Sequence, residues 1–461
     1  MRKYVFENTV SAVIYSECIN NTLQELWCGF CFRAGNIEFA ESDELIFKIG
    51  DVTVPKLVGN EKYAFQITER GICGTAVNKE SLIRGFLKLI QKIKPLNLDE
   101  GSEKFFLECG EIRDTFDIKI RMVHLCVFPE TDLDFLKKTV RYCGILGYTH
   151  IILEFWGMLK YDCLKELSWP QAYSKEQAKA LIDEIRAVGA EPVPMFNMLG
   201  HAAGSRMMSG KHVVLDQNPR LQPLFFEDGW VWDFRNAKTV ELMCKIRYEL
   251  YELFGNGHFI HIGCDEAHEC GRNYDLSNAF CDYITSATTE ILEKEHRRPI
   301  MWADMLLSSN GCGLKSEPGS GYEFWCADGR IADKILSGLD KKVILADWQY
   351  AVKSAPMVTT KYLHEQGFDV LSCPWSDTYN VKACVDTARQ LGSLGVMDTT
   401  WHTLNDCWYS LFDCAFYCDE ENFGRELDPW VIKSGKMAAV SRKLLSDYSE
   451  YEQCGWIGKQ K

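Results

Sequence analysis

The segment His258-Phe259-Ile260-His261-Ile262-Gly263-Cys264-Asp265-Glu266-Ala267-His268-Glu269 joins a short apolar run, a glycine and two adjacent carboxylates. This pattern predicts a strand that gives way to a loop at Gly263. Side chains alternate along a strand and the chain turns at its end, so Asp265 and Glu266 point in different directions. Two carboxylates in one pocket can then differ in pKa, as acid/base catalysis at neutral pH requires. The pair alone leaves open a solvated acidic loop that caps a helix.

Strand and helix signals alternate along most of the chain around this segment. Apolar and β-branched runs predict eight strands, at 118–125, 150–155, 191–196, 259–263, 299–304, 342–348, 369–373 and 396–401. Amphipathic stretches between them predict helices, such as 132–146, 175–188 and 240–254. Eight strands with helical crossovers are typical of a TIM (β/α)8 barrel rather than an open doubly wound sheet. We assign a ninth run, 321–325, to the connection after the fifth strand.

The residues before the barrel follow a different pattern. Runs at 4–15 and 44–54 predict strands, residues 63–77 predict a hairpin, and 79–94 predicts a helix. We therefore predict an α/β chain with a small α+β domain at residues 1–112 and a barrel domain at residues 113–461. The CxxC spacing of Cys28 and Cys31 is interpreted as chance, because no second pair or nearby histidine accompanies it.

Composition restricts the class of protein. With 461 residues and a formal net charge of -14, the chain is unsuited to bind nucleic acid or an anionic membrane surface. Its twenty cysteines have no regular spacing, which predicts reduced core residues rather than a disulfide framework. We recognise neither a secretory signal nor a membrane-spanning run. The sequence predicts a cytoplasmic protein without nucleic-acid or membrane partners, and it leaves a homodimer open.

The barrel prediction gathers polar and aromatic residues at one rim, because such barrels build their sites at the carboxyl ends of the strands. The residues assigned to these ends are Arg121, His124, Glu154, Asn197, His201, Asp265, Glu266, Trp302, Asp304, Trp348, Tyr350, Trp375 and Trp401. Indole rings stack on the apolar faces of sugars, while charged groups bind hydroxyls, so this set favours a carbohydrate pocket. Any single tryptophan can equally fill a barrel layer.

The order of these motifs resembles glycoside hydrolase family 20, the exo-β-N-acetylhexosaminidases. Residues 261–266 are similar to that family's H-x-G-G-D-E signature after the fourth barrel strand, and residues 197–201 are similar to its P-G-H loop. Residues 118–121 resemble its first-strand arginine, 301–304 its pocket tryptophan, and 347–350 its Trp-x-Tyr element. The small domain ahead of the barrel is also similar, so the resemblance covers nearly the whole chain.

The resemblance implies an exo-acting, retaining β-N-acetylhexosaminidase that removes terminal N-acetylglucosamine or N-acetylgalactosamine from glycans. It implies substrate-assisted catalysis through an oxazolinium intermediate, in which Glu266 is the acid/base and Asp265 orients the 2-acetamido group. A fixed carboxylate also suits a cationic intermediate electrostatically. The strand-end positions and the resemblance together give the predicted substrate contacts, which are Arg121, Glu154, His201, Trp302, Trp348, Tyr350, Trp401 and Asp406. Neither a metal nor a cofactor is implied.

The sequence departs from the family pattern at several positions. Cys264 replaces the second glycine of the signature, and Leu199 replaces the proline of the P-G-H loop. The acid expected after Trp401 is absent there, and Asp406 or Asn405 is the candidate substitute. The identity of the sugar therefore stays open, including a substituted hexosaminide.

Other functions were weighed from the same segment. Residues 265–268 spell the DEAH box of helicases, but the chain has no G-x-x-x-x-G-K-[ST] loop. A metal site at residues 261–269 is disfavoured because those side chains do not share one face of a helix. A sugar-binding or regulatory barrel without turnover stays open, since barrels host many functions. Cys264 is either a target of thiol reagents or a buried, inert thiol.

Overall fold

The computed structural model describes residues 2–7, 12–15, 37–40, 45–96, 104–203, 214–314, 321–326, 328–406, 408–422 and 424–425. Cys28 and Cys31 lie outside these ranges. Every cysteine in the described part of the chain is free, and most are buried, which agrees with reduced core residues. Within the same ranges, no helix is long and apolar enough to cross a bilayer.

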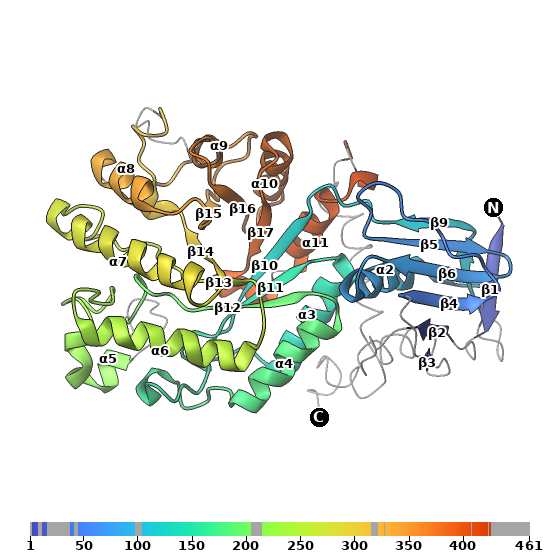
Figure 1. Cartoon of the computed structure of the whole chain (residues 1–461), viewed down its shortest axis with the longest axis horizontal. Coiled ribbons are helices and arrows are strands. Elements are labelled where there is room, and N and C mark those ends of the chain that lie inside the picture. Colours follow the sequence, from blue (N-terminus) through green and yellow to red (C-terminus); the bar gives the residue numbers. More distant parts are fainter. Residues whose placement is uncertain are drawn as a thin grey trace, which may run out of the picture.

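Eight parallel strands close into a barrel in which each strand pairs with the next and the last pairs with the first (Figure 1). The strands are β10 Ile120–Cys126, β11 His150–Glu154, β12 Glu191–Met195, β13 Phe259–His261, β14 Arg298–Trp302, β15 Ile344–Trp348, β16 Asp369–Cys373 and β17 Gly395–Thr399. All eight predicted strands are therefore confirmed. Residues 321–325 form no strand and lie in the connection after β14, as predicted.

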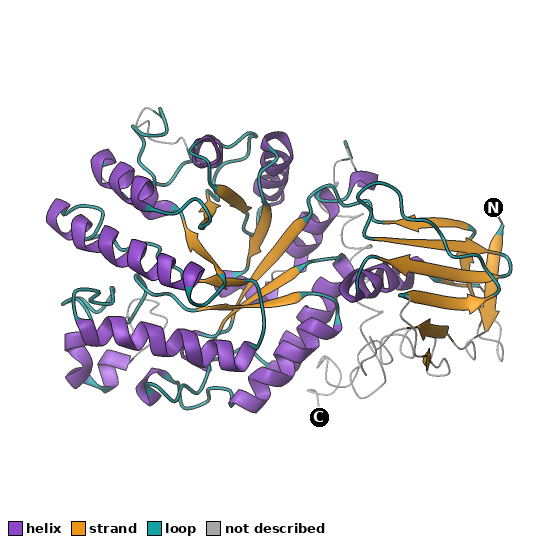
Figure 2. Ribbon diagram, in the orientation of Figure 1, coloured by secondary structure: helices purple, strands orange, loops and turns teal. Residues whose placement is uncertain are grey.

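Helices surround this barrel on the outside (Figure 2). The longer ones are α3 Leu133–Leu146, α4 Lys175–Ala187, α6 Ala237–Phe254, α7 Tyr274–Glu293, α8 Gly329–Gly338, α9 Val358–Glu365, α10 Thr378–Leu391 and α11 Trp408–Tyr417. Local sequence sets their ends. The Asp132 side chain accepts the first free N–H groups of α3, while Gly147 ends that helix in the left-handed conformation. A capping box between Ser174 and Gln177 starts α4.

Short segments complete the loops between barrel strands and helices. They are α5 Val214–Gln217 and the 3-10 segments η1 Trp156–Met158, η2 Lys165–Leu167, η3 Pro219–Leu224, η4 Asp304–Leu306, η5 Trp401–Asp406 and η6 Glu420–Asn422. Three of them, η1, η4 and η5, begin within two residues of the carboxyl end of a barrel strand. The chain therefore turns tightly where it leaves the barrel, and the residues at these turns stay close to the rim.

Two antiparallel-rich sheets precede the barrel. One has the order β3-β2-β4-β6-β5-β9 and the other β1-β8-β7. Their strands are β1 Lys3–Glu7, β2 Ala12–Tyr15, β3 Ile37–Ala40, β4 Ile46–Gly50, β5 Tyr63–Thr68, β6 Gly71–Ala76, β7 Lys94–Pro95, β8 Lys104–Glu108 and β9 Gly110–Arg113. The predicted hairpin is β5–β6, and the predicted helix is α2 Lys79–Lys92. A small α+β unit thus precedes the barrel.

Helix α2 joins this unit to the amino end of the barrel (Figure 1). One face buries Phe86, whose ring centroid lies 5.4 Å from that of Phe47 in the sheet. On another face, Arg84 Nη1 donates to the carbonyl of Gly189, 2.7 Å away in the turn before β12. Lys88 Nζ lies 3.2 Å from the Asp419 carboxylate after α11. In the residues that the structure describes, these contacts place the N-terminal unit against the amino end of the barrel.

Candidate active site

The backbone is strained at the carboxyl ends of the barrel strands. Among the described residues, seven that are not glycine have positive φ, and all but His296 follow the end of a barrel strand: Trp156, His201, Cys264, Glu266, Ser376 and Trp401. Such a conformation costs about 1 kcal/mol or more per residue, so it persists only where the surroundings impose it. Strained residues of this kind cluster at functional sites, so their positions indicate that the site lies at the carboxyl ends of the strands.

The loops after β12 and β13 pack so closely that two positions, Gly200 and Gly263, have no room for a side chain. Gly263 has a φ of 68°, and a Cβ placed on it would lie 2.4 Å from Cγ of Asn197. A Cβ on Gly200 would lie 2.0 Å from the carbonyl oxygen of Asp265. Asn197 then ties the two loops together, because its Oδ1 accepts the N–H of Cys264 at 3.0 Å and its Nδ2 donates to Asp265. The two glycines therefore fix the position of the carboxylate pair.

One imidazole lies between the two adjacent carboxylates. His201 Nε2 is 3.3 Å from Asp265 Oδ2 and 3.0 Å from Glu266 Oε2. The Asp265 side chain is only 4% exposed, whereas that of Glu266 is 24% exposed. The neighbouring acids thus occupy different environments, one enclosed and one accessible from outside. This is the separation that distinct acid/base and electrostatic roles require.

A third carboxylate supports the backbone of this pair. Asp304 Oδ2 accepts the backbone N–H of Glu266 at 2.8 Å, and its Oδ1 accepts the indole N–H of Trp348 at 3.4 Å. Burial raises the pKa of Asp304 well above its usual value, and the charge of Asp265 adds to that rise. Burial also raises the pKa of Glu323, and Glu266 contributes to that increase. Acidic groups therefore gather around Glu266, and burial favours the protonated forms of Asp304 and Glu323.

Aromatic rings form a wall beside the carboxylates. The ring centroids of Trp302 and Trp401 are 5.3 Å apart, and those of Trp348 and Tyr350 are 5.2 Å apart in a stacked arrangement. The Tyr350 hydroxyl oxygen accepts the indole N–H of Trp401 at 2.6 Å, which leaves its own O–H as a donor. Trp302 Nε1 is buried and has no hydrogen-bond partner in the described part of the chain. The wall thus offers apolar faces together with donors.

The prediction that Arg121 binds substrate hydroxyls is wrong, because its side chain lies at the opposite end of the barrel. Arg121 is the second residue of β10, so it starts near the amino end of that strand. Its guanidinium donates to the carbonyls of Gly147 and Ile118, each at 2.6 Å, and its Cζ lies 3.8 Å from the ring centroid of Phe116. The residue type suits a sugar, but its position in the strand does not.

Of two further predicted contacts, Glu154 lies behind the wall and the side chain of Asp406 falls outside the described residues. Glu154 is 1% exposed, and its Oε2 lies 3.0 Å from Nε2 of His124. The His124 ring packs edge-on against Trp302 and Trp401, with centroids 5.6 and 5.0 Å apart. The structure therefore places Glu154 behind these rings, with its carboxylate held by His124. Asp406 ends η5, and its side chain lies outside the described part of the chain.

The structure gives specific contacts to two residues that the sequence placed at the strand ends without a role, Asn197 and Asp304, and it adds Trp230, which the sequence analysis did not name. Asn197 and Asp304 follow strand ends and carry polar groups, so strand position was the signal available for both. Trp230 Nε1 donates to the backbone carbonyl of Glu266 at 2.9 Å, and its ring centroid lies 4.3 Å from that of His201. It belongs to the long connection before α6, where no pattern in the sequence indicated a role.

Two histidines and a cysteine of the segment 258–269 pack around the carboxylate pair without an assigned role in catalysis. His261 ends β13, and its Nδ1 accepts the N–H of Gly263 at 3.0 Å, so it orients the backbone that follows the strand. Burial lowers the pKa of His268, whose ring centroid lies 4.6 Å from that of Trp325. Cys264 is fully buried, and burial raises the pKa of its thiol well above the usual value. Of the two predictions for Cys264, the structure supports the inert thiol.

Comparison with known proteins finds the same kind of protein by sequence and by structure. Residues 153–404 match the model of the glycosyl hydrolase family 20 catalytic domain. A chitobiase from Flavobacterium johnsoniae superposes with a TM-score of 0.69 at 14% identity, covering 100% of this chain and 72% of the other. β-N-acetylhexosaminidases from Bacteroides fragilis and Streptomyces coelicolor superpose with TM-scores of 0.65 at 15% and 16% identity, covering 98% and 96% of this chain and 93% of each of theirs. The folds therefore agree although the sequences have diverged.

Proposed function

This chain belongs to glycosyl hydrolase family 20, and from that premise we propose that it is an exo-acting, retaining β-N-acetylhexosaminidase that uses the substrate's own acetamido group as the nucleophile. The observation that carries the proposal is the arrangement of Asp265 and Glu266 around His201, with one carboxylate enclosed and the other accessible. The substrate is a terminal N-acetylglucosamine or N-acetylgalactosamine of a glycan.

In the first step, Glu266 donates its proton to the glycosidic oxygen as the bond to the anomeric carbon breaks. The acetamido carbonyl oxygen of the substrate attacks that carbon from the opposite side, which gives a cyclic oxazolinium ion. Asp265 accepts the hydrogen bond of the acetamido N–H and stabilises the positive charge of the ion. Its hydrogen bond from Asn197 and its contact with His201 support this role, because they hold the carboxylate in one orientation.

In the second step, the carboxylate of Glu266 removes a proton from water, which attacks the anomeric carbon and reopens the ring. Two displacements at one carbon leave the configuration of the sugar unchanged. The backbone of Glu266 is held by Asp304 on its N–H and by Trp230 on its carbonyl, so the side chain keeps its position between the steps. The partial exposure of Glu266 suits a group that must exchange a proton with a leaving group and then with water.

The aromatic wall supports recognition of the acetamido group. In this proposal the Tyr350 O–H donates to the acetamido oxygen, since that hydroxyl already accepts the indole N–H of Trp401. Trp302 and Trp401 enclose the methyl group, and Trp348 stacks beside Tyr350. A sugar without the acetamido group would lack both the nucleophile and these contacts, so it would not be cleaved.

The test is release of an aromatic alcohol from β-N-acetylglucosaminide, β-N-acetylgalactosaminide and plain β-glucoside substrates, with a thiazoline analogue of the oxazolinium ion as the inhibitor. We expect cleavage of the acetamido sugars alone, together with competitive inhibition by the thiazoline. Cleavage of the plain glucoside at a similar rate would contradict substrate assistance. Absence of cleavage from all three would instead favour a sugar-binding barrel or an enzyme for a substituted hexosaminide.

The partners, the cellular location and the oligomeric state of the enzyme remain predictions from its sequence. The acidic net charge disfavours nucleic acid and anionic membranes as partners. The free cysteines of the described residues suit a reducing compartment, and we propose the cytoplasm. Cell fractionation followed by immunodetection tests that location, and light scattering of the purified protein tests whether it forms a homodimer.

A further inference from the structure

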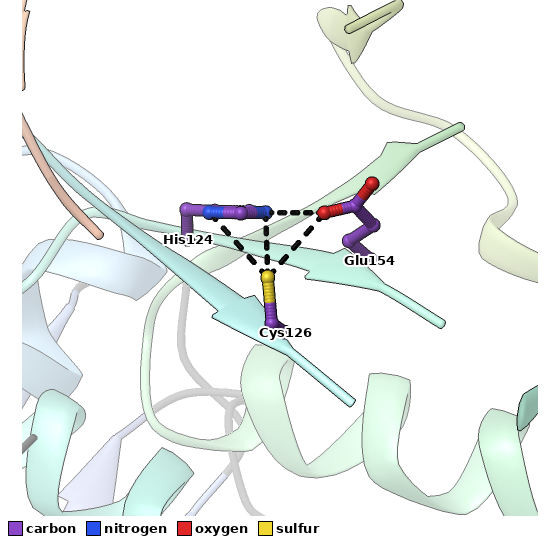
Figure 3. A group of neighbouring side chains, drawn as sticks. All are labelled: His124, Cys126 and Glu154. Atoms are coloured by element: carbon purple, nitrogen blue, oxygen red, sulfur yellow. Dashed lines mark hydrogen bonds and ion pairs between the residues drawn. The ribbon is translucent and has the colours of Figure 1, made fainter. Parts of the chain in front are cut away.

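Three side chains from two neighbouring strands meet inside the barrel (Figure 3). His124 and Cys126 are two residues apart on β10, so they project from the same face of that strand. Glu154 ends β11 and stands opposite Cys126 in the parallel pairing of the two strands. All three side chains are essentially inaccessible to solvent. In the described part of the chain, this is the one group of three such residues whose donor atoms all lie within 4.8 Å of one another.

The separations of the donor atoms fit one face of a coordination tetrahedron. His124 Nε2 lies 3.0 Å from Glu154 Oε2 and 3.5 Å from Cys126 Sγ, and that Sγ lies 3.4 Å from the same oxygen. Zinc bonds to nitrogen, oxygen and sulfur place such ligand atoms roughly 3.3–3.6 Å apart in a tetrahedral site. The nitrogen and oxygen would separate by a few tenths of an ångström around an ion, a shift within the reach of side-chain rotation.

The same geometry is unsuited to nucleophilic catalysis by the thiol. In a cysteine–histidine–acid relay, one imidazole nitrogen faces the thiol while the other faces the carboxylate. Here Nε2 of His124 is the nitrogen closer to the thiol and also the one that contacts Glu154, while Nδ1 lies 3.9 Å from the sulfur. All three donor atoms surround a common point rather than forming a chain. Convergence on one point is the feature expected of ligands.

Charge and donor chemistry favour a divalent ion of the later transition series. A thiolate and a carboxylate would be costly to bury together, but a divalent cation makes the group electrically neutral. A mixture of nitrogen, sulfur and oxygen donors suits zinc better than magnesium or calcium, which prefer oxygen alone. Three protein ligands leave one tetrahedral position for a small ligand.

We propose that His124, Cys126 and Glu154 bind a divalent transition-metal ion, with zinc as the expected occupant. The sequence predicts no metal, and the ligand set that its motifs bring to mind lies at residues 261–269, so the site at His124, Cys126 and Glu154 is a different one. It is also separate from the proposed hydrolysis, in which the reaction needs no metal. The ion would fix the ends of β10 and β11, and through the His124 ring it would support Trp302 and Trp401 from behind.

The experiment measures metal content in the full-length chain. Because the ligands are buried, we expect the ion to enter as the chain folds, so the protein is prepared by expression in zinc-supplemented medium and by refolding with Zn²⁺. After gel filtration, mass spectrometry of the metal should give about one zinc ion per chain. The variants Cys126→Ser and Glu154→Gln should fall to background. Glu266→Gln should retain the zinc, which separates this result from the outcome of the hydrolysis tests.

A matched control comes from another buried cysteine. Cys373 ends strand β16 as Cys126 ends β10, is equally buried, and lies outside the cluster. Cys373→Ser should therefore keep its zinc. Refolding with Co²⁺ provides a spectroscopic readout, because a cobalt–thiolate bond gives a charge-transfer band in the near ultraviolet. That band should be present in the wild type and in Cys373→Ser, and absent in Cys126→Ser.

The proposal is overturned if the wild type holds less than about a tenth of a metal ion per chain by both routes. It is also overturned if Cys126→Ser retains as much zinc as Cys373→Ser. Should a variant fail to fold, the wild-type cobalt spectrum decides alone: tetrahedral visible bands with a thiolate band support the site, and their absence refutes it. Bound zinc should also raise the melting temperature of the wild type but not that of Glu154→Gln.

Discussion

The two ends of the barrel treat buried charge in opposite ways. At the amino end, the Arg121 guanidinium is buried with its donors satisfied, since it donates to backbone carbonyls of adjacent turns and lies over the Phe116 ring. At the carboxyl end, the carboxylates of Asp265, Glu266 and Asp304 gather within one another's electric field on a strained backbone. The comparison indicates that the charged group at the amino end stabilises the fold. The acidic groups at the carboxyl end are instead placed to interact with a ligand.

The largest expected effect comes from the accessible acid. Glu266→Gln should lower kcat/KM about a thousandfold on substrates with poor leaving groups, because the amide cannot donate a proton to the glycosidic oxygen. The loss should be much smaller with a leaving group that departs without protonation, and the free energy of unfolding should stay near that of the wild type. Steady-state kinetics over a series of aryl leaving groups measures this dependence.

Glu269→Gln is the matched control, since it makes the same chemical change at an exposed position three residues away. It should leave the kinetics unchanged. An equal loss on every leaving group in Glu266→Gln would show that this residue is not the acid.

The enclosed acid should have the next largest effect. Asp265→Asn should lower kcat/KM about a hundredfold, because a neutral amide stabilises the cationic intermediate less. Unlike the loss in Glu266→Gln, this one should be similar for all leaving groups, and the thiazoline should bind more weakly. Kinetics and inhibition constants on the same substrate series measure both. A dependence on the leaving group like that of Glu266→Gln would refute the division of roles.

A histidine at the amino end should control stability in acid. Burial lowers the pKa of His150 from 6.5 to about 4. Between these pH values the imidazole is protonated in the unfolded chain and neutral in the folded chain. The free energy of unfolding should therefore be highest above pH 6.5. It should fall by up to about 3 kcal/mol as the pH is lowered toward 4. Urea unfolding between these pH values should show that fall in the wild type.

The fall should be weaker in His150→Asn, which cannot take up the proton. The exposed residue His296 serves as the control, and His296→Asn should show the wild-type dependence on pH. If His150→Asn loses stability in acid as steeply as the wild type, burial of this imidazole is not the cause.

Arg121 provides the direct contrast between the two ends. Arg121→Met should destabilise the fold by about 2 kcal/mol, because the carbonyls of Gly147 and Ile118 lose their donors. The kcat/KM of the folded fraction should stay unchanged, since the side chain does not reach the carboxyl end. Urea unfolding and kinetics on the same preparation test both parts. A large rise in KM without loss of stability would restore the original prediction that Arg121 binds the sugar.

The smallest effect is expected at Cys264, which has a φ of 74° at the position where the family pattern has glycine. Cys264→Gly should change the free energy of unfolding by less than about 1 kcal/mol, because relief of backbone strain offsets the loss of a buried thiol. Thiol reagents should inactivate the wild type and this variant at equal rates. A slower inactivation of the variant would show that Cys264 is reactive after all.

Much of the fold was predictable because it depends on local pattern. The eight strands, the hairpin and the helix before the barrel follow from alternation and helical periodicity, and each appears within a few residues of its predicted bounds. The place of the Asp265–Glu266 pair at a strand end was predictable for the same reason. Gly263 marks that end, because no larger residue fits beside Asn197.

The failures concern where a side chain goes after it leaves the backbone. Arg121 has a suitable residue type on the correct strand, but it is the second residue of that strand, so its side chain starts near the amino end of the barrel and not at the rim. Glu154 stands at a strand end as predicted, but His124 and Cys126 hold its carboxylate behind the tryptophans. Trp230 comes from a connection without periodic pattern, so only the folded chain reveals its bond to Glu266.

The sequence by itself determined the barrel, the order of its strands and the candidate acid/base pair, because these depend on neighbours along the chain. Tertiary structure decided which charged groups lie close together, which donate to backbone carbonyls, and which donor atoms meet at one point. His124 and Cys126 share a strand face by simple alternation, but only the parallel pairing of β10 with β11 brings Glu154 to them. Electrostatic and ligand geometry depend on distances through space, and those distances are set by packing between strands rather than by spacing in the sequence.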